Sequence, residues 1–216
     1  MQKKYRWLIG VATAVAGSTL AVATATGAFS GSKAVPSFAG NLIPSTANAN
    51  AGVAAPDATQ TSAFQAFARP ARTEDSGATA ASLLEGLARS QQRFAVNPSL
   101  GRAVYTSADT QLYVYPGRGV VCFGAVSTQY GTTVGCTQTT AAVQQGLGSQ
   151  ITVGGVSFVQ GVLPAGAHDV MITDSSGAQT PVSLTSDGGY AVQLAVQGTL
   201  LSYADRSGTP RQQQLH

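Results

Sequence analysis

The sequence predicts a mainly β protein built as an antiparallel sandwich or barrel with one packed helix. Two observations lead to this fold class. Short apolar runs recur about every eight to twelve residues after Arg102, with turn residues between them. A single strong helical pattern precedes these runs, and no alternation of strands with helices follows. The second observation argues against a parallel nucleotide-binding sheet, which needs a helix between successive strands.

Composition divides the chain into three segments. Residues 1–30 are predicted to form a hydrophobic helix that serves as an N-terminal membrane anchor or signal peptide. Residues 31–74 are predicted to be a low-complexity, disordered spacer. Residues 75–216 are predicted to be the helix and the β-rich domain, which lies outside the cytoplasm.

The first segment has the charge pattern of an export signal. Lys3, Lys4 and Arg6 precede an uncharged run over residues 7–29, and basic residues on that side place the N-terminus in the cytoplasm. The run is long enough for a membrane anchor, whereas residues 21–25 offer the A-x-A pattern of a cleaved signal peptide. The anchor is favoured because the uncharged run continues past that pattern. We expect a cell-membrane protein with an extracytoplasmic body, or alternatively a secreted protein.

The net charge of +3 comes from this export signal. Without its three basic residues, the rest of the chain has nine basic and nine acidic side chains and is formally neutral. Nucleic-acid binding needs clustered Lys and Arg to neutralise phosphates. We therefore expect no nucleic-acid partner, and partners limited to the membrane, through the N-terminal helix, and a protein or cell-wall ligand.

The second segment is rich in Ala, Ser, Thr, Asn, Gly and Pro. Such a composition buries too little apolar surface to offset its ordering entropy. Phe64 and Phe67 could form a short helical turn that docks elsewhere, but a partly ordered spacer is the favoured interpretation.

A helix is predicted over residues 76–95, with Asp75 or Ser76 as the N-cap. Asn97 and Pro98 end it, and Gly86 weakens its middle by up to about 1 kcal/mol relative to Ala. The apolar residues that fall near one face at the 3.6-residue period are Ala80, Leu83, Leu84, Leu87, Ala88 and Phe94. We expect this face to pack on the strands.

Strands are predicted from apolar runs bounded by turn residues. The Gly154-Gly155 pair is a strong hairpin signal, and residues 139–145 have the pattern of a short helix. The predicted strands are residues 112–115, 120–126, 132–136, 151–153, 156–159, 169–173, 181–184, 190–196 and 200–203.

Cys122 and Cys136 are the only cysteines of the chain. A zinc site needs four ligands and a redox site usually has the Cys-x-x-Cys spacing, so neither fits. In an exported chain two cysteines favour a structural disulfide. A loop of this length would add about 3 kcal/mol on the loop-entropy model.

Three segments carry a family resemblance: residues 161–177, with a Pro-Ala-Gly turn and a strand ending in Asp-x-x-Gly, residues 189–194, and the last hairpin over residues 201–208. In these patterns, over about residues 100–210, the chain resembles uncharacterised exported or membrane-anchored actinobacterial proteins with a small C-terminal immunoglobulin-like β domain. The resemblance implies a small immunoglobulin-like sandwich. It transfers no catalytic residue.

Few residues offer catalytic chemistry. His168 is the one histidine before the terminal residue, and its neighbour Asp169 would point to the opposite face of a strand. Asp174, Asp187 and Asp205 lie in Gly-containing turns, where Asp normally bonds its own backbone. No cofactor motif or metal-ligand spacing occurs. We expect no enzyme; the alternative is an envelope hydrolase or an enzyme accessory subunit that uses His168 and the loop aspartates.

Tyrosines are the other candidate site residues, because their amphipathic rings are favoured at interfaces. The tyrosines predicted to form a binding surface are Tyr113, Tyr115, Tyr190 and Tyr203. The sequence thus predicts a non-catalytic, extracytoplasmic cell-envelope module with a binding or structural role.

Overall fold

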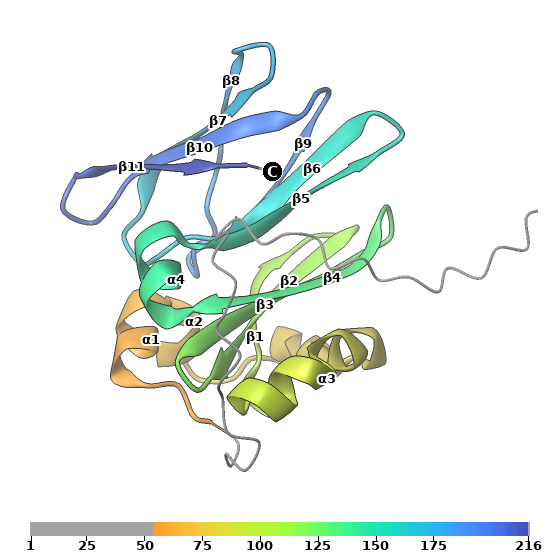
Figure 1. Cartoon of the computed structure of the whole chain (residues 1–216), viewed down its shortest axis with the longest axis vertical. Coiled ribbons are helices and arrows are strands. Elements are labelled where there is room, and N and C mark those ends of the chain that lie inside the picture. The colour runs from red at the N-terminus through yellow and green to blue at the C-terminus, as the bar shows by residue number, and fades with distance from the viewer. Residues whose placement is uncertain (1–53, 216) are drawn as a thin grey trace, which may run out of the picture. The chain divides into compact units, whose positions relative to one another are not determined.

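The computed structural model describes residues 54–215, all of which belong to one compact unit, Ser32–His216. This part of the chain is mainly β, with antiparallel sheets and few helices (Figure 1). The predicted fold class is confirmed at this level. The hydrophobic helix expected in residues 1–30 lies outside the described residues.

The elements follow one another in the order that Figure 1 labels. The helices are α1 (Ala58–Ala63), α2 (Gln65–Ala68), α3 (Ala81–Phe94) and α4 (Thr139–Gln145), with 3-10 turns η1 (Thr73–Thr79) and η2 (Pro98–Leu100). The strands are β1 (Arg102–Thr106), β2 (Thr110–Gly117), β3 (Val120–Ser127), β4 (Gly131–Gln138), β5 (Leu147–Val153), β6 (Val156–Val162), β7 (His168–Asp174), β8 (Gln179–Pro181), β9 (Gly189–Leu194), β10 (Gly198–Ala204) and β11 (Pro210–Gln214).

Strands β1 to β4 form a four-stranded antiparallel meander in chain order. Gly119 and Gly131 have positive φ in its last two turns, a conformation that glycine adopts without a steric penalty. Strand β3 is buried along nearly its whole length, because both faces of the meander are covered. Figure 1 shows the meander between α3 and the strands that follow α4.

Helix α3 covers one face of the meander. Leu83, Leu87 and Phe94 are buried on it, as the helical period predicts. The helix begins at Ala81, later than predicted, and its N-cap Ala80 makes no side-chain cap. The predicted caps, Asp75 or Ser76, both lie in η1, and the Asp75 carboxylate binds Arg69 instead.

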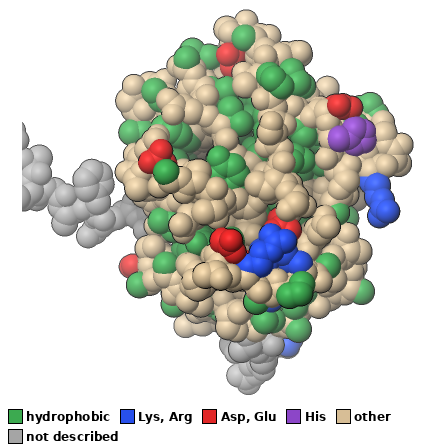
Figure 2. Space-filling model, turned by 180° about the vertical axis from the view of Figure 1, so that it is seen from behind, with side chains coloured by type: hydrophobic (Ala, Val, Ile, Leu, Met, Phe, Trp, Pro, Cys, Tyr) green, Lys and Arg blue, Asp and Glu red, His purple; other side chains and the backbone are tan. Residues whose placement is uncertain are grey.

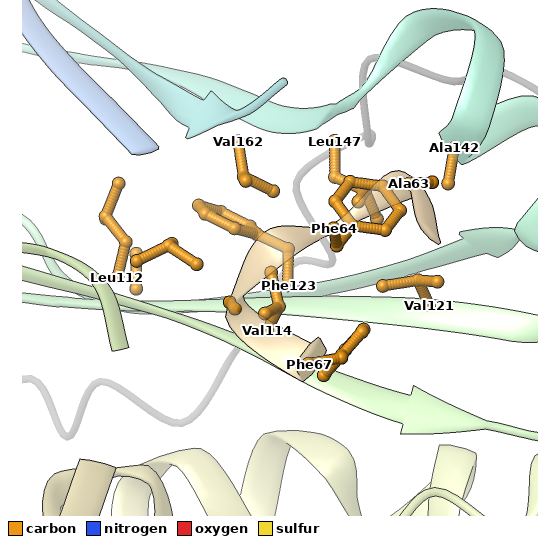
Figure 3. Packing of buried hydrophobic residues seen from close by; sticks show 13 residues of the cluster. Ala63, Phe64, Phe67, Leu112, Val114, Val121, Phe123, Ala142, Leu147 and Val162 are labelled. Atoms are coloured by element: carbon orange, nitrogen blue, oxygen red, sulfur yellow. The ribbon is translucent and has the colours of Figure 1, made fainter. Parts of the chain in front are cut away.

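Helices α1 and α2 lie at the other face, so the prediction of a disordered spacer is wrong for residues 54–74. Asp57 and Gln60 form a capping box at the start of α1. Phe64 is fully buried and Phe67 nearly so, within the cluster that Figure 3 shows between the meander and β5–β6. The segment is ordered because these two rings fill space that the sheets leave between them; composition averaged over the segment hides this.

The remaining strands form two further antiparallel sheets. One has the order β5-β6-β9 and the other β11-β10-β7-β8. Their facing sides share one apolar cluster, which includes Val159 and Leu194 from the first sheet and Ile172 and Leu201 from the second. The immunoglobulin-like unit was expected over residues 100–210. These two sheets occupy residues 147–214 alone, because the strands before α4 form a sheet of their own.

Candidate binding surface

The predicted disulfide is present between Cys122 on β3 and Cys136 on β4. The two residues are directly opposite in the register of the hairpin. Cys122 is buried beside Leu83 and Leu87 of α3, in the cluster that Cys136 also borders. The disulfide therefore joins the two strands of the β3–β4 hairpin beneath α3. This position indicates a structural role.

The four tyrosines predicted to form a binding surface are core residues. Tyr113, Tyr115, Tyr190 and Tyr203 are each at most 4% exposed. The first two belong to the cluster under α3 and the other two to the cluster between the last two sheets. The prediction is wrong, because the strand period shows which residues share a face but not which faces are covered. Helix α3 covers the face of Tyr113 and Tyr115, and the two later sheets cover Tyr190 and Tyr203 between them.

The buried hydroxyl groups have structural hydrogen bonds. The Tyr115 hydroxyl donates to the Ala78 carbonyl at 2.9 Å, and the Tyr203 hydroxyl donates to the Gln144 carbonyl at 2.8 Å. Burial raises the pKa of Tyr203 to about 12 and raises the pKa of Tyr115 as well. Both phenols thus stay neutral and act as fixed donors to backbone.

Tyr130 is half-buried, as Tyr105 is, and it contacts a strand of a second sheet. It stands in the turn between β3 and β4, and its hydroxyl donates to the side-chain oxygen of Gln160 on β6. Its ring centroid lies 5.2 Å from that of Phe158. Burial raises the pKa of Tyr130. The sequence-based prediction did not distinguish Tyr130 from the other tyrosines. Its position next to Gly131, in the turn of a predicted hairpin, could have indicated that it lies outside the strands and nearer the surface.

The part of the chain around Tyr130 carries no charge. No Asp, Glu, Lys or Arg occurs between Arg118 and Asp169, and this stretch includes strands β3 to β6. At the tip of the β5–β6 hairpin the apolar side chains that share one face and reach the surface are Ile151, Val153, Val156 and Phe158. We call β4, Tyr130 and these four residues the neutral surface. None of these residues is charged, and the nearby charge that contacts the Tyr130 turn is Asp109, which accepts a hydrogen bond from the Thr128 hydroxyl at 3.3 Å. The surface itself suits an uncharged partner and offers no acid–base pair.

The main cluster of charged side chains is buried and connects separate segments of the fold. The Arg69 guanidinium contacts Asp75 and Asp187, each at 2.8 Å, and all three side chains are more than nine-tenths buried. Asp75 Oδ1 accepts the Ala103 N–H at 2.7 Å, and Arg69 Nη2 donates to the Ala103 carbonyl at 2.8 Å. The cluster therefore covers the outer edge of β1 and joins it to the turn before β9.

Within residues 54–215, no loop aspartate carboxylate binds His168. Asp205 follows Ala204, the cross-strand partner of His168, but its carboxylate contacts Arg211 at 2.8 Å. The His168 side chain is half exposed, 3.8 Å from the exposed Asp169 carboxylate. Figure 2 shows a histidine side chain and an acidic side chain next to each other on this face of the molecule. This closeness differs from the expectation of opposite faces, because Asp169 has a positive φ of 53° at a register shift in β7. Asp174 is at the other end of β7, about 20 Å away at the usual rise per residue.

The loop aspartates have the turn roles expected of them, with one exception. Asp174 and Asp205 each accept hydrogen bonds from the backbone N–H groups two and four residues later. A hydroxyl bond from Ser176 lowers the pKa of Asp174, and bonds from Ser207 and Arg211 lower the pKa of Asp205. Asp187 is the exception, since it is buried against Arg69.

Residues 54–215 contain no group of three or more His, Cys, Asp or Glu side chains placed to hold a metal ion. Within the same residues, every helix is too short or too polar to cross a lipid bilayer. Comparisons of the chain with protein-family models, with curated proteins and with solved structures find no match.

Proposed function

We propose that the protein is a non-catalytic binding or structural module of the cell envelope, with its body outside the cytoplasm. The observation that carries the proposal is the arrangement of β5–β11. An immunoglobulin-like constant domain has strands A, B, E and D in one sheet and C, F and G in the other. Here β5-β6-β9 take the places of A, B and E, and β7, β10 and β11 those of C, F and G.

The short strand β8 distinguishes this order from the constant-type domain. It pairs with β7 rather than β9, so the fourth strand lies beside C instead of beside E. Seven short antiparallel strands around one core are typical of the sandwiches found in many cell-surface domains. Because fold alone does not fix function, the neutral surface supplies the second support: it offers contact area without catalytic groups.

Two sequence features support the extracytoplasmic site of action. The basic residues before the apolar run over residues 7–29 have the pattern of an exported chain. The Cys122–Cys136 disulfide fits an oxidising compartment. We propose a membrane anchor at the N-terminus, with a secreted form as the alternative, and a protein or cell-wall polymer as the ligand.

Fractionation of the producing cells tests this proposal. The full chain should remain in the membrane pellet after carbonate extraction, and the purified protein should be retained on isolated envelope material. A soluble, N-terminally trimmed product would indicate the secreted form. Accumulation in the cytoplasm, with no retention on envelope material, would contradict the proposal.

The hydrolase alternative is tested separately with ester, glycoside and peptide substrates. We expect no turnover by the full chain. Turnover by the full chain that is lost in His168→Ala would assign a catalytic role to His168, and the non-catalytic part of the proposal would be wrong.

A further inference from the structure

The edges of the three sheets differ in how they are protected. An open strand edge presents unpaired N–H and C=O groups that can pair with another chain, and proteins normally cover or blunt such edges. The β1 edge is covered by Arg69 and Asp75, which bind the Ala103 backbone. Thr185 adds a hydrogen bond to the Val104 carbonyl at 2.6 Å.

Other edges are short, blunted or buried. Strand β8 is three residues long and ends at Pro181, and β11 begins at Pro210 and carries the exposed Arg211. Strand β9 lies so close to β1 that a side chain at Gly189 would meet the Val104 carbonyl. Strand β5 is buried over its first four residues. The remaining edge, β4, has eight residues with no proline or charge, and most of them are partly or fully exposed.

The register of the hairpin shows which β4 groups face outward. The Cys122 and Cys136 Cα atoms are 4.0 Å apart, which marks a pair without mutual main-chain hydrogen bonds. The N–H and C=O groups of Cys136, and by alternation those of Val134 and Thr132, therefore point away from β3. None of the hydrogen bonds described within residues 54–215 uses these outward groups.

The position of α3 decides what kind of partner fits this edge. Helix α3 packs directly on β4: a side chain at Gly86 would meet Val134, and Cys136 Sγ lies 3.1 Å from Ser90 Oγ. Paired strands are about 4.8 Å apart, whereas packed helices need about 8–10 Å. A second copy joined to β4 by antiparallel pairing, the arrangement that the sheet already uses, would place both α3 helices on the same face and too close together. A lone extended segment needs only the width of a strand.

We propose that the β4 edge binds one extended, uncharged peptide segment of a partner protein, which adds to the meander as a fifth strand. Main-chain hydrogen bonds to Thr132, Val134 and Cys136 supply the affinity in this mode of recognition. The absence of charge between Arg118 and Asp169 fits a neutral segment. The inference rests on the proposed function as a binding module and names its partner class.

A synthetic peptide tests the edge directly. The probe has the uncharged sequence of β4 itself, with Cys136→Ser and blocked ends, and is titrated into the full chain. Binding should be insensitive to salt, because no charge pair forms. It should slow amide exchange at Thr132, Val134 and Cys136. N-methylation of one alternate set of peptide residues should weaken binding at least about tenfold, while methylation of the other set leaves it unchanged.

Matched variants of the protein complete the test. Thr132→Lys places a charge on the edge and should abolish binding of the peptide, whereas Gln129→Lys, with the same charge in the adjoining turn, should not. No binding at millimolar peptide, equal effects of both methylated sets, or protection at β5 instead of β4 would each overturn the inference. Slow exchange at the three amides before peptide is added would also overturn it, because the chain itself would then cover the edge.

Retention on envelope material separates the two proposals. If Thr132→Lys is retained as well as the unmodified chain, the edge inference fails while the binding module stands. If neither protein is retained, the proposed function fails, and peptide binding at β4 is judged on the exchange data alone.

Discussion

At the residue scale, Asp75 shows how one side chain can hold several segments. Its carboxylate accepts hydrogen bonds from the Arg69 guanidinium and from the N–H groups of Arg72 and Ala103. Burial by itself raises the pKa of Asp75, but these bonds outweigh burial and lower the pKa from 3.8 to about 2. The sequence suggested a helix cap here, because an Asp that precedes an apolar run resembles an N-cap residue. Its partner in the structure, Arg69, could not be predicted, because no sequence periodicity connects the two residues.

The lowered pKa predicts a pH dependence. A depressed pKa means that the ionised carboxylate stabilises the fold above its unfolded pKa near 4, and that this contribution is lost as the pH falls towards about 2. Asp75→Asn should lower the free energy of unfolding at neutral pH by about 3 kcal/mol, because Arg69 loses a buried partner. It should also flatten the pH dependence between about 4 and 2.

Urea unfolding over a pH series measures both effects. Glu74→Gln is the matched control, because Glu74 is exposed and next to Asp75 in the chain. An Asp75→Asn protein with the parent's pH profile would show that the carboxylate does not contribute as described.

At the element scale, Gly86 explains a local weakness of α3. A glycine within a helix costs about 1 kcal/mol relative to Ala, and nothing in the sequence indicates what the glycine allows. In the structure a Cβ at position 86 would lie 2.7 Å from Val134 Cγ2. Glycine at this position lowers the helix propensity of α3 but allows the helix to pack closely on β4. Helix existence was predictable from its period, whereas this contact between distant segments was not.

A double-mutant cycle tests this account of Gly86. Gly86→Ala alone should destabilise the protein by about 1 kcal/mol, because overpacking against the stiff Val134 side chain outweighs the propensity gain. In a Val134→Ala background the same change should become neutral or stabilising, and thermal unfolding of the four proteins measures the sign. A stabilising effect in both backgrounds would mean that α3 does not pack this closely on β4.

The β3–β4 hairpin provides a second prediction at this scale. Replacing both cysteines, Cys122→Ala with Cys136→Ala, should lower the free energy of unfolding by about 3 kcal/mol, since the disulfide closes a short loop. Thiol labelling of the unreduced, unfolded chain should detect no free thiol. Two labelled cysteines, or equal stability with and without reductant, would contradict a structural disulfide.

At the scale of the whole molecule, the segment before α3 is part of the core. The Gln60 side chain donates to the Gly117 and Val120 carbonyls, at 2.9 and 2.8 Å. Phe64 lies with Leu147 in the cluster between the meander and the later strands (Figure 3). The strand pattern after Arg102 was predictable because its period is local. The division into separate sheets was not predictable. It depends on contacts between segments far apart in the sequence, such as those of Phe64 and Phe67 with the meander and with β5–β6.

Truncation tests this dependence. A fragment of residues 54–216 should fold, whereas a fragment of residues 75–216 should lose cooperative unfolding, because it lacks the rings of Phe64 and Phe67 and the Arg69 partner of Asp75 and Asp187. Phe64→Ala in the longer fragment should cost about 3–5 kcal/mol through the cavity it leaves. Exposed Gln65→Ala is the control, expected to change stability by less than about 0.5 kcal/mol. Equal melting temperatures for the two fragments would show that residues 54–74 do not stabilise the fold. The domain would then begin at residue 75, as composition alone suggests.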